Sequence, residues 1–345
     1  MSKIKVLIID DSAVIRNILS SNLSKFEDIE IIGTAADPYE GRDMIVKFRP
    51  DVVTLDIEMP KMNGLEFVGV LMEHYPLPVI IVSSLVTGRC DTSLKALELG
   101  AIDIFAKPSS DISRNMPLQM ADLHNKIIAA SHAKVTKRIT SGIIKKSSSL
   151  ASIKASDKII AIGSSTGGTE AVRKVLEPLP SNIPPVIITQ HMPAGFTNSF
   201  AKRLNDICRN IEVKEAENNE RLINGTALIA PGGFHLLLKR DGAKYKVILK
   251  DGPKVCHQKP SADVMFYSVA EAAGKNSIGV ILTGMGADGA DGLLKMKNKG
   301  ALTIGQSERT CVVYGMPREA ALRGAIDFVE DLENIPEKIV NLLNL

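Results

Sequence analysis

Tryptophan is absent from this sequence of 345 residues, and aromatic residues make up only 4% of it. Proteins that bind single-stranded nucleic acid stack bases on aromatic side chains, so this scarcity argues against such a surface. An excess of one charge is missing too, because 42 basic residues face 39 acidic ones for a formal net charge of +3. Since a near balance of charge is not typical of a protein that coats nucleic acid, we expect no nucleic-acid partner.

Cysteine and long apolar runs are also scarce. The four cysteines are scattered and form no C-x-x-C pair, which argues against a disulfide framework or a cysteine-type zinc site and fits a reducing compartment. The apolar run near the N-terminus is too short for a signal peptide, and no stretch approaches the roughly 18 apolar residues of a spanning helix. We therefore expect a cytoplasmic protein without membrane insertion.

The remaining composition is that of a globular protein, with 45% hydrophobic and 23% charged residues, and the length favours two domains. Residues 133–157 read AKVTKRITSGIIKKSSSLASIKASD, a basic, serine-rich stretch without a sustained apolar period. This stretch predicts a first domain of residues 1–130, a solvated linker of residues 131–157 and a second domain of residues 158–345. A basic patch that contacts an acidic partner is the alternative interpretation of the linker.

Short β-branched runs alternate with helical periods before the linker. Strands are expected at residues 6–10, 30–35, 52–56, 79–83 and 102–105. Helices are expected at residues 13–23, from 38, after 64, at 93–99 and at 118–130. This alternation predicts a parallel sheet covered by helices on both faces.

The alternation resumes after the linker. Strands are expected at residues 159–162, 186–189, 227–230 and 278–282, with helices at 170–176 and 261–273. Two further runs, residues 234–239 and 245–250, flank Asp241-Gly242 and resemble a hairpin. The second domain is therefore expected to be a doubly wound, mainly parallel α/β fold with an antiparallel hairpin.

Carboxylates close two strands of the first domain. Asp10 and Asp11 follow the first strand, and Asp56 closes the third. Because the carboxyl ends of parallel strands form one rim, these acids are expected to converge there. Converging carboxylates repel each other, so a hard divalent cation is expected, and Mg²⁺ prefers such oxygen ligands. Helix capping is the alternative for each acid, although it does not explain Asp56.

Two more strand ends of the first domain carry polar groups. Ser83 ends the fourth strand, and Lys107 follows the fifth. A hydroxyl and an ammonium at the same rim would hold the oxygens of a phosphorylated aspartate. Each residue taken alone is also compatible with an ordinary surface position.

With these residues, the first 130 positions resemble a receiver domain of two-component signalling, which implies a flavodoxin-like (βα)5 fold. The resemblance implies that Asp56 is the phosphoacceptor and that a histidine kinase is the phosphodonor. It further implies Mg²⁺ held by Asp11, Asp56 and the backbone carbonyl of Glu58, an acidic pocket that includes Asp10, and phosphoryl sensing by Ser83 and Lys107.

One position departs from the receiver pattern. Three residues before the lysine, where many receivers carry tyrosine or phenylalanine as a rotameric switch, this chain has Ile104, with Phe105 beside it. The departure argues against signal transmission by an aromatic flip.

The loop Gly163–Gly168 reads GSSTGG between an expected strand and helix. It does not spell G-x-G-x-x-G and lacks the lysine of a P-loop, so a nucleotide site is disfavoured. A tight strand-to-helix turn can instead present a serine nucleophile, which needs a base to take its proton.

The best-placed base is His191, because its motif QHMP ends an expected strand. His235 and His257 are either structural or line a substrate groove, and the other histidines belong to the first domain or its exit helix. An acid must then orient the imidazole. Asp288 in TGMGADG is the candidate, whereas Asp291 is expected on the surface of the following helix.

The motifs GSSTGG, QHMP and TGMGADG match, in this order, those of the chemotaxis response regulator protein-glutamate methylesterases, the CheB family, which the whole chain resembles. The resemblance implies Ser165 as nucleophile, His191 as general base, Asp288 as its orienter and the Met285 amide as oxyanion donor. The segments APGG (residues 230–233) and KPSADVMF (residues 259–266) also look like family signatures that shape the rim of the site.

The resemblance implies a phosphorylation-activated serine hydrolase that serves chemotactic adaptation. Its substrates would be glutamate γ-methyl esters on the cytoplasmic helices of methyl-accepting chemoreceptors, and specific receptor glutamines that it deamidates. Mg²⁺ would serve the phosphorylation of Asp56, and ester hydrolysis is expected to need no cofactor. The alternatives are a response regulator with a DNA-binding output domain, which would show a basic recognition helix, and a catalytically silent scaffold.

Overall fold

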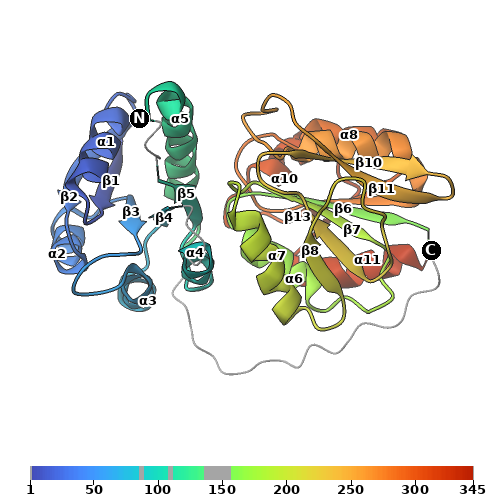
Figure 1. The fold of residues 1–345 in the computed structure, drawn as a ribbon, viewed down its shortest axis with the longest axis horizontal. Coiled ribbons are helices and arrows are strands. Elements are labelled where there is room, and N and C mark those ends of the chain that lie inside the picture. Colours follow the sequence, from blue (N-terminus) through green and yellow to red (C-terminus); the bar gives the residue numbers. More distant parts are fainter. Residues whose placement is uncertain (1, 85–88, 108–111, 136–156, 345) are drawn as a thin grey trace. The chain divides into compact units, whose positions relative to one another are not determined.

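The computed structural model describes residues 2–84, 89–107, 112–135 and 157–344. Two compact units, Met1–Gly142 and Ile143–Leu345, divide the chain (Figure 1). The predicted linker of residues 131–157 spans this division, and its residues 136–156, together with the basic patch considered there, lie outside the described residues.

The first unit is a five-stranded parallel sheet with the order β2-β1-β3-β4-β5. Its strands are β1 (Ile4–Ile9), β2 (Ile29–Ala35), β3 (Val52–Asp56), β4 (Val79–Ser83) and β5 (Asp103–Ala106). Its helices are α1 (Ala13–Leu23), α2 (Pro38–Phe48), α3 (Gly64–His74), α4 (Arg89–Glu98) and α5 (Ile112–Ser131). This is the predicted flavodoxin-like (βα)5 arrangement.

Both faces of this sheet are covered, because β3 and β4 are buried along their whole length. Right-handed crossovers place α1 on one face and α2, α3 and α4 on the other, and α5 packs against α1. The prediction for the last helix was wrong at its start, since α5 begins at Ile112 and contains Pro117. A proline in the second turn removes one backbone hydrogen bond without ending the helix.

The second unit is built on a seven-stranded parallel sheet with the order β14-β13-β12-β6-β7-β9-β8. Its strands are β6 (Ile159–Ser164), β7 (Val186–Gln190), β8 (Glu212–Glu215), β9 (Thr226–Ile229), β12 (Ser277–Ile281), β13 (Leu302–Gln306) and β14 (Phe328–Glu330). Its helices are α6 (Gly168–Leu176), α7 (Phe196–Ile207), α8 (Ala262–Ala272), α9 (Ala290–Asn298), α10 (Met316–Leu322) and α11 (Ile335–Leu343).

The predicted hairpin forms a sheet of its own. Strands β10 (His235–Asp241) and β11 (Lys244–Lys250) pair in an antiparallel ladder. Lys246 of β11 also forms an isolated antiparallel bridge with Arg221, and β10 packs against α8. The apolar side of α8 fills the space between this hairpin and the large sheet, with Phe266 and Met265 fully buried. Helix α8 is therefore packed between the hairpin and the large sheet.

The strand order marks one place for a site in the second unit. The chain runs outward from β6 through β7 on one side and later from β12 through β13 on the other. Ligands of open α/β sheets bind at such a reversal, outside the carboxyl ends of the strands. Helix α8 reaches this edge because Gly163 has no side chain; a Cβ there would lie 3.0 Å from the Cβ of Ala262.

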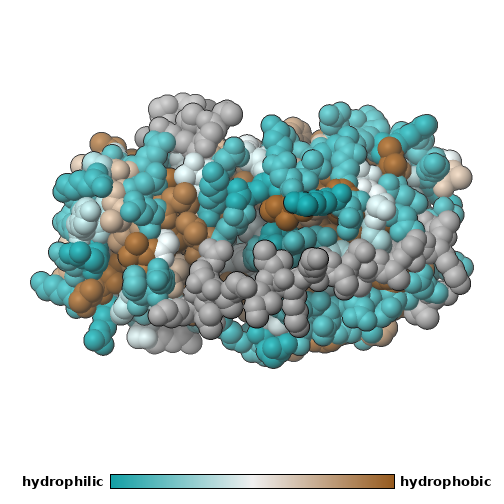
Figure 2. Space-filling view, turned by 90° about the horizontal axis from the view of Figure 1, so that it is seen from below, coloured by the Kyte–Doolittle hydropathy of each residue, from teal (hydrophilic) through white to brown (hydrophobic). Residues whose placement is uncertain are grey.

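Within the described part of the chain, no helix is both long and apolar enough to cross a bilayer. Figure 2 shows a face on which hydrophilic side chains predominate and apolar ones form separate patches.

Candidate functional site

Ser165 follows β6 directly and is held by its backbone. Its N–H donates to the carbonyl of Thr283 at 3.0 Å, beside the end of β12. Its own carbonyl accepts from the N–H of Gly168 at 2.6 Å and from Nε2 of Gln190 at 2.9 Å. The serine is 9% exposed. The turn from β6 into α6 therefore fixes this residue at the switch point of the sheet.

Gln190, the last residue of β7, ties this turn to the next strand. Its Nε2 donates both to the carbonyl of Ser165 and, at 3.2 Å, to the carbonyl of His191, while its Oε1 accepts from Ser164 Oγ at 2.7 Å. Sequence reasoning assigned no role to Gln190, and its only signal was membership of the QHMP motif. One buried amide thus connects the backbones of the candidate nucleophile and the candidate base.

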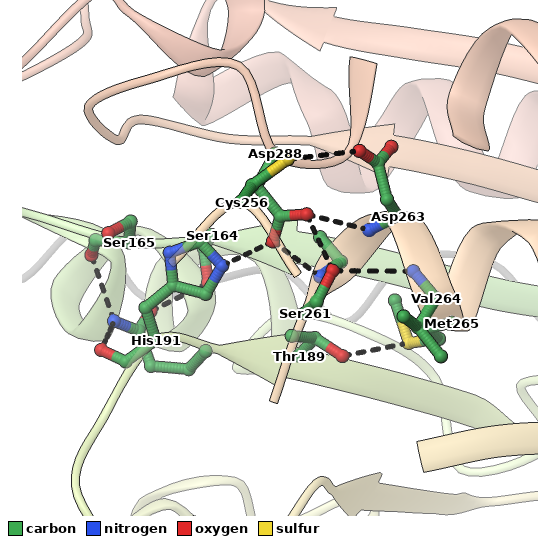
Figure 3. A network of polar contacts seen from close by, with 12 residues as sticks. Ser164, Ser165, Thr189, His191, Cys256, Ser261, Asp263, Val264, Met265 and Asp288 are labelled. Atoms are coloured by element: carbon green, nitrogen blue, oxygen red, sulfur yellow. Dashed lines mark hydrogen bonds and ion pairs between the residues drawn. The ribbon is translucent and has the colours of Figure 1, made fainter. Parts of the chain in front are cut away.

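His191 and Asp288 form a buried pair. Nε2 of His191 donates to Oδ2 of Asp288 at 2.6 Å, and the two residues are 6% and 2% exposed. Nδ1 of His191 is buried and has no hydrogen-bond partner among the described residues; in Figure 3 it faces Ser165, and no hydrogen bond joins the two. A proton held on Nε2 leaves a lone pair on Nδ1 toward the serine, and such contacts often shorten only when substrate binds.

Asp288 lies in a loop and not in a strand. Strand β12 ends at Ile281, and Asp288 lies in the following loop, against the first turn of α8. Its carboxylate accepts from Ser261 Oγ at 2.6 Å, from the N–H of Ala262 at 2.7 Å and from the N–H of Asp263 at 3.1 Å. Burial raises the pKa of this carboxyl, but the hydrogen bonds from His191, Ser261 and Ala262 lower its pKa below the ordinary value overall.

The backbone of the same loop lies against the nucleophile. A Cβ added to Gly284 would lie 2.7 Å from the Cβ of Ser165, so only glycine permits this approach. Gly286 has a φ of +86°, a conformation that favours glycine. The amide of Met285 between them has no hydrogen-bond acceptor among the described residues. An N–H in this position is available to a developing oxyanion.

The other candidate residues of the second unit differ in their burial and contacts. His235 is buried, with Nε2 donating to the carbonyl of Pro253 at 2.9 Å, so of its two expected roles the structural one applies. His257 is exposed. Asp291 pairs with Arg323 at 2.8 Å on the surface, as expected.

The acids of the first unit also converge. Asp10, Asp11 and Asp56 offer carboxylate oxygens within 4.8 Å of one another. Nζ of Lys107 pairs with Oδ2 of Asp56 at 2.6 Å and with Oδ2 of Asp10 at 2.8 Å. Burial raises the pKa of Asp56, although Lys107 opposes this effect. Burial lowers the pKa of Lys107, but hydrogen bonds to Asp10 and Asp56 outweigh it and leave this pKa raised.

A cavity of ≈ 260 Å³ opens beside these acids. Its lining includes Asp11, Asp56, Glu58, Asn63, Ser83, Thr92 and Lys107. Asn63 and Thr92 were not singled out from the sequence. Oxygen ligand atoms predominate in this lining, and among the described residues Lys107 forms ion pairs with two of the three carboxylates. These residues therefore fit a hard divalent cation.

Ile104 and Phe105, where the sequence departs from the usual receiver pattern, are both buried in β5 and are 2% and 3% exposed. Neither side chain therefore occupies the surface position that a rotameric switch requires for its outward state.

These features define a class of protein. A flavodoxin-like unit carries an acidic pocket with a lysine, and an α/β unit carries a serine beside a buried histidine–aspartate pair. The class is a receiver domain joined to a hydrolase-type output domain. The comparisons with known proteins narrow this class further.

Two family models match the chain: response regulator receiver domain over residues 6–114 and CheB methylesterase over residues 160–339. The chain belongs to the CheB methylesterase family. The match to an enzyme family over most of the second unit gives no support to a DNA-binding output domain.

Similar proteins cover the chain almost completely. The protein-glutamate methylesterase/protein-glutamine glutaminase 2 of Syntrophus aciditrophicus (strain SB) is 53% identical over 348 residues, which cover 99% of this chain and 100% of that one. The protein-glutamate methylesterase/protein-glutamine glutaminase of Escherichia coli (strain K12) is 49% identical over 342 residues, with 99% and 97% covered. The crystal structure of the Thermotoga maritima CheB methylesterase catalytic domain matches with a TM-score of 0.53 and 42% identity, covering 55% of this chain and all of that one.

Proposed function

We propose that this chain is a phosphorylation-activated serine hydrolase that hydrolyses glutamate γ-methyl esters of methyl-accepting chemoreceptors and releases methanol. We extend the proposal to deamidation of receptor glutamines, because the same acyl transfer releases ammonia from an amide. The observation that carries the proposal is the His191 imidazole, with Nε2 on Asp288 and Nδ1 unpartnered toward Ser165. The names of the similar proteins support the substrate class.

The first half of the reaction is acylation. Ser165 Oγ attacks the ester carbonyl carbon while His191 Nδ1 takes the hydroxyl proton. The carbonyl oxygen becomes an oxyanion, to which the Met285 amide donates. When the tetrahedral intermediate collapses, the bond between the acyl carbon and the methoxy oxygen breaks, and methanol leaves with the proton from Nδ1. Asp288 keeps Nε2 protonated and stabilises the imidazolium while it exists.

Deacylation repeats these steps with water in place of the serine. His191 takes a proton from the water, which attacks the acyl carbon, and then returns a proton to Ser165 Oγ as the ester bond to the enzyme breaks. The product is a glutamate carboxylate. When the substrate is glutamine, the leaving group of the first half is ammonia and the final product is the same.

The first unit, which we take as residues 1–130, is proposed to control this activity through phosphorylation of Asp56 by a chemotaxis histidine kinase in the cytoplasm. Asp11, Asp56 and the carbonyl of Glu58 would hold Mg²⁺, which supplies positive charge for the incoming phosphoryl oxygens. Lys107 and Ser83 line the same cavity and are proposed to bind the oxygens of phosphorylated Asp56. Residues 131–157 would connect this unit to the hydrolase of residues 158–345.

Methanol release from methylated receptor membranes, with a small phosphodonor such as acetyl phosphate, tests the proposal. Ser165→Ala should lower the rate on the order of 10⁴-fold, because the substitution removes the hydroxyl that forms the acyl-enzyme. Ser164→Ala is the matched control, since Ser164 Oγ is already engaged with Gln190, and it should retain far more activity than Ser165→Ala. Unchanged methanol release by Ser165→Ala would remove the serine from the mechanism.

A further inference from the structure

The buried hydrogen-bond network does not end at Asp288. Beyond the carboxylate it continues through Ser261 to His235, and among the described residues neither is hydrogen-bonded to Ser165 or His191 (Figure 3 shows Ser261). We infer that Ser261 and His235 are positioning residues, which fix the orientation and basicity of Asp288 and thereby the proton affinity of His191. This inference rests on the proposed function of the same site.

The contacts of Ser261 fix the direction in which its hydroxyl donates. Ser261 caps α8 and is fully buried, and its Oγ accepts from the N–H of Val264 at 3.4 Å. The hydroxyl proton is then free to point at Oδ1 of Asp288, 2.6 Å away. A short bond from a hydroxyl to a carboxylate belongs to the strong class of hydrogen bonds. Ser261 therefore withdraws charge from the oxygen opposite the one that faces His191.

His235 holds the serine in place from the other side. Its Nδ1 accepts the backbone N–H of Ser261 at 3.2 Å, and its Nε2 donates to the carbonyl of Pro253 at 2.9 Å. With one nitrogen accepting and the other donating, the ring is a neutral imidazole of a single tautomer. A protonated ring could not accept from Ser261. His235 thus anchors the backbone of the capping residue to β10.

The four donors to Asp288 are divided evenly between its two oxygens. Oδ1 accepts from Ser261 Oγ and from the N–H of Asp263, whereas Oδ2 accepts from the N–H of Ala262 and from His191. This division leaves the carboxylate one orientation. The N-terminus of α8 also favours its negative charge.

The other ionisable groups near Asp288 come from three elements. Asp263 lies on α8, Cys256 lies in the loop before α8, and Asp291 begins α9. Burial raises the pKa of Cys256 to about 11 and that of Asp263 to about 6. Cys256 is therefore neutral in the pH range of the test, whereas Asp263 titrates within that range. Substitutions at Ser261 and His235 leave all three of these side chains in the protein.

Loss of the Ser261 hydroxyl would leave more negative charge on Asp288, which stabilises the imidazolium of His191 and raises the pH at which His191 becomes an active base. In the full chain with acetyl phosphate, Ser261→Ala should lower kcat for methanol release about tenfold or more with little change in KM. The acid limb of the kcat–pH profile should move to higher pH. Ser261→Thr, which keeps a hydroxyl, should restore most of the shift.

His235→Ala should move the acid limb in the same direction by a smaller amount, because Ser261 keeps its hydroxyl but loses its anchor. His235→Asn offers Oδ1 in place of Nδ1 and should recover part of the effect. Ser268→Ala is the matched control: Ser268 also joins α8 to β10, by accepting from the N–H of Leu238 at 2.8 Å, but it is not bonded to Asp288. This variant should lose stability without moving the acid limb.

A substrate-free measurement separates this inference from the proposed function. The titration of the His191 ring is followed by proton NMR and assigned by comparison with His191→Gln. It should shift to higher pH in Ser261→Ala and not in Ser268→Ala, whether or not the wild type releases methanol. If the titration and the acid limb of Ser261→Ala coincide with those of the wild type, or if Ser268→Ala shifts them equally, the positioning role is overturned.

Discussion

Each unit places polar side chains at the carboxyl edge of its own parallel sheet. The two units differ in the groups that stabilise the buried carboxylates. In the first unit, Asp10 and Asp56 share one ammonium group, that of Lys107, beside a cavity lined by further oxygen donors. In the second unit, a single carboxylate, Asp288, is surrounded by backbone N–H groups, one hydroxyl and one imidazole.

The difference corresponds to the role that we propose for each carboxylate, phosphorylation for Asp56 and orientation of His191 for Asp288. A carboxylate that is to be phosphorylated needs mobile or exchangeable positive charge and room for new oxygens, and a lysine with a cavity supplies both. A carboxylate that only orients a histidine needs to remain ionised and still. Fixed dipoles from a helix N-terminus provide this without a second charge. The comparison predicts that the two aspartates respond very differently to the same substitution.

Asp288→Asn should have the largest effect. The amide would present a donor where the carboxylate accepts, and the Nε2 proton of His191 would lose its acceptor, so Nδ1 would no longer be the unprotonated nitrogen. We expect a fall in kcat of about 10³- to 10⁴-fold, with the fold retained, measured as methanol release from methylated receptor membranes. A loss of tenfold or less would show that the carboxylate does not fix the tautomer.

Asp56→Asn should abolish the response to acetyl phosphate and leave the unstimulated rate of methanol release unchanged, because Asp56 belongs to the first unit and not to the proton relay. The measured quantity is the ratio of stimulated to unstimulated rates, which should fall to about one. Asp51→Asn is a suitable control, since this exposed acid accepts from the backbone N–H of Lys5, away from the acidic pocket, and should leave the ratio at the wild-type value. Stimulation that survives in Asp56→Asn would move the phosphoacceptor elsewhere.

The strand ends were the part of the fold that could be predicted most closely from the sequence. Strands β3 and β4 match the predicted residues 52–56 and 79–83. A short β-branched run that ends at a polar residue is typical of a buried strand in a parallel sheet. Strands β8, β13 and β14 were not predicted. Strand β8 reads Glu-Val-Lys-Glu at one edge of the sheet, β14 has three residues at the other edge, and β13 reads Leu-Thr-Ile-Gly-Gln. None of the three shows a continuous apolar run.

The sequence could predict the residues of the candidate proton relay but not the residues that position them. Ser165, His191 and Asp288 were selected by motif and by resemblance, and the structure brings these three together. Ser261 was noted only within a segment expected to shape the rim, and His235 was left between two roles. Their contacts depend on how α8 meets β10, and a single sequence carries no signal for such packing between distant segments.

Substitutions of glycine compare the two units through smaller expected effects on stability and kcat. A Cβ at Gly168 would lie 2.2 Å from Gln190 Oε1 and 2.8 Å from the Cβ of Ser164, and the Gln190 amide is held by three hydrogen bonds. Gly168→Ala should therefore destabilise the second unit by about 1–3 kcal/mol. Displacement of Ser165 should also lower kcat, by roughly 10²-fold.

Gly69, in α3 of the first unit, provides the contrasting case. Nothing lies within 4 Å of a Cβ added there, so Gly69→Ala should stabilise the first unit by about 0.5–1 kcal/mol through reduced entropy of the unfolded chain. Urea unfolding of the full chain measures both variants. Equal effects of the two substitutions would contradict the idea that the nucleophile turn is sterically closed.

The smallest effect concerns Asp263, whose carboxyl has none of the compensation that Asp288 receives from a histidine. Burial and the charge of Asp288 raise its pKa to about 6, although the N–H of Gly292 opposes this rise. As the pH increases from about 4, the unfolded chain releases this proton first. The folded chain therefore loses stability between pH 4 and 6, and the loss persists at higher pH.

Asp263→Asn removes this titration, so its stability relative to the wild type should rise by on the order of 1 kcal/mol between pH 4 and 8, after allowance for solvent screening. Urea unfolding at several pH values measures the difference. Asp251→Asn is the control of opposite sign, because Lys259 lowers the pKa of Asp251 and its contribution is lost as the pH falls. Parallel pH dependences for the two variants would show that folding does not raise the pKa of Asp263.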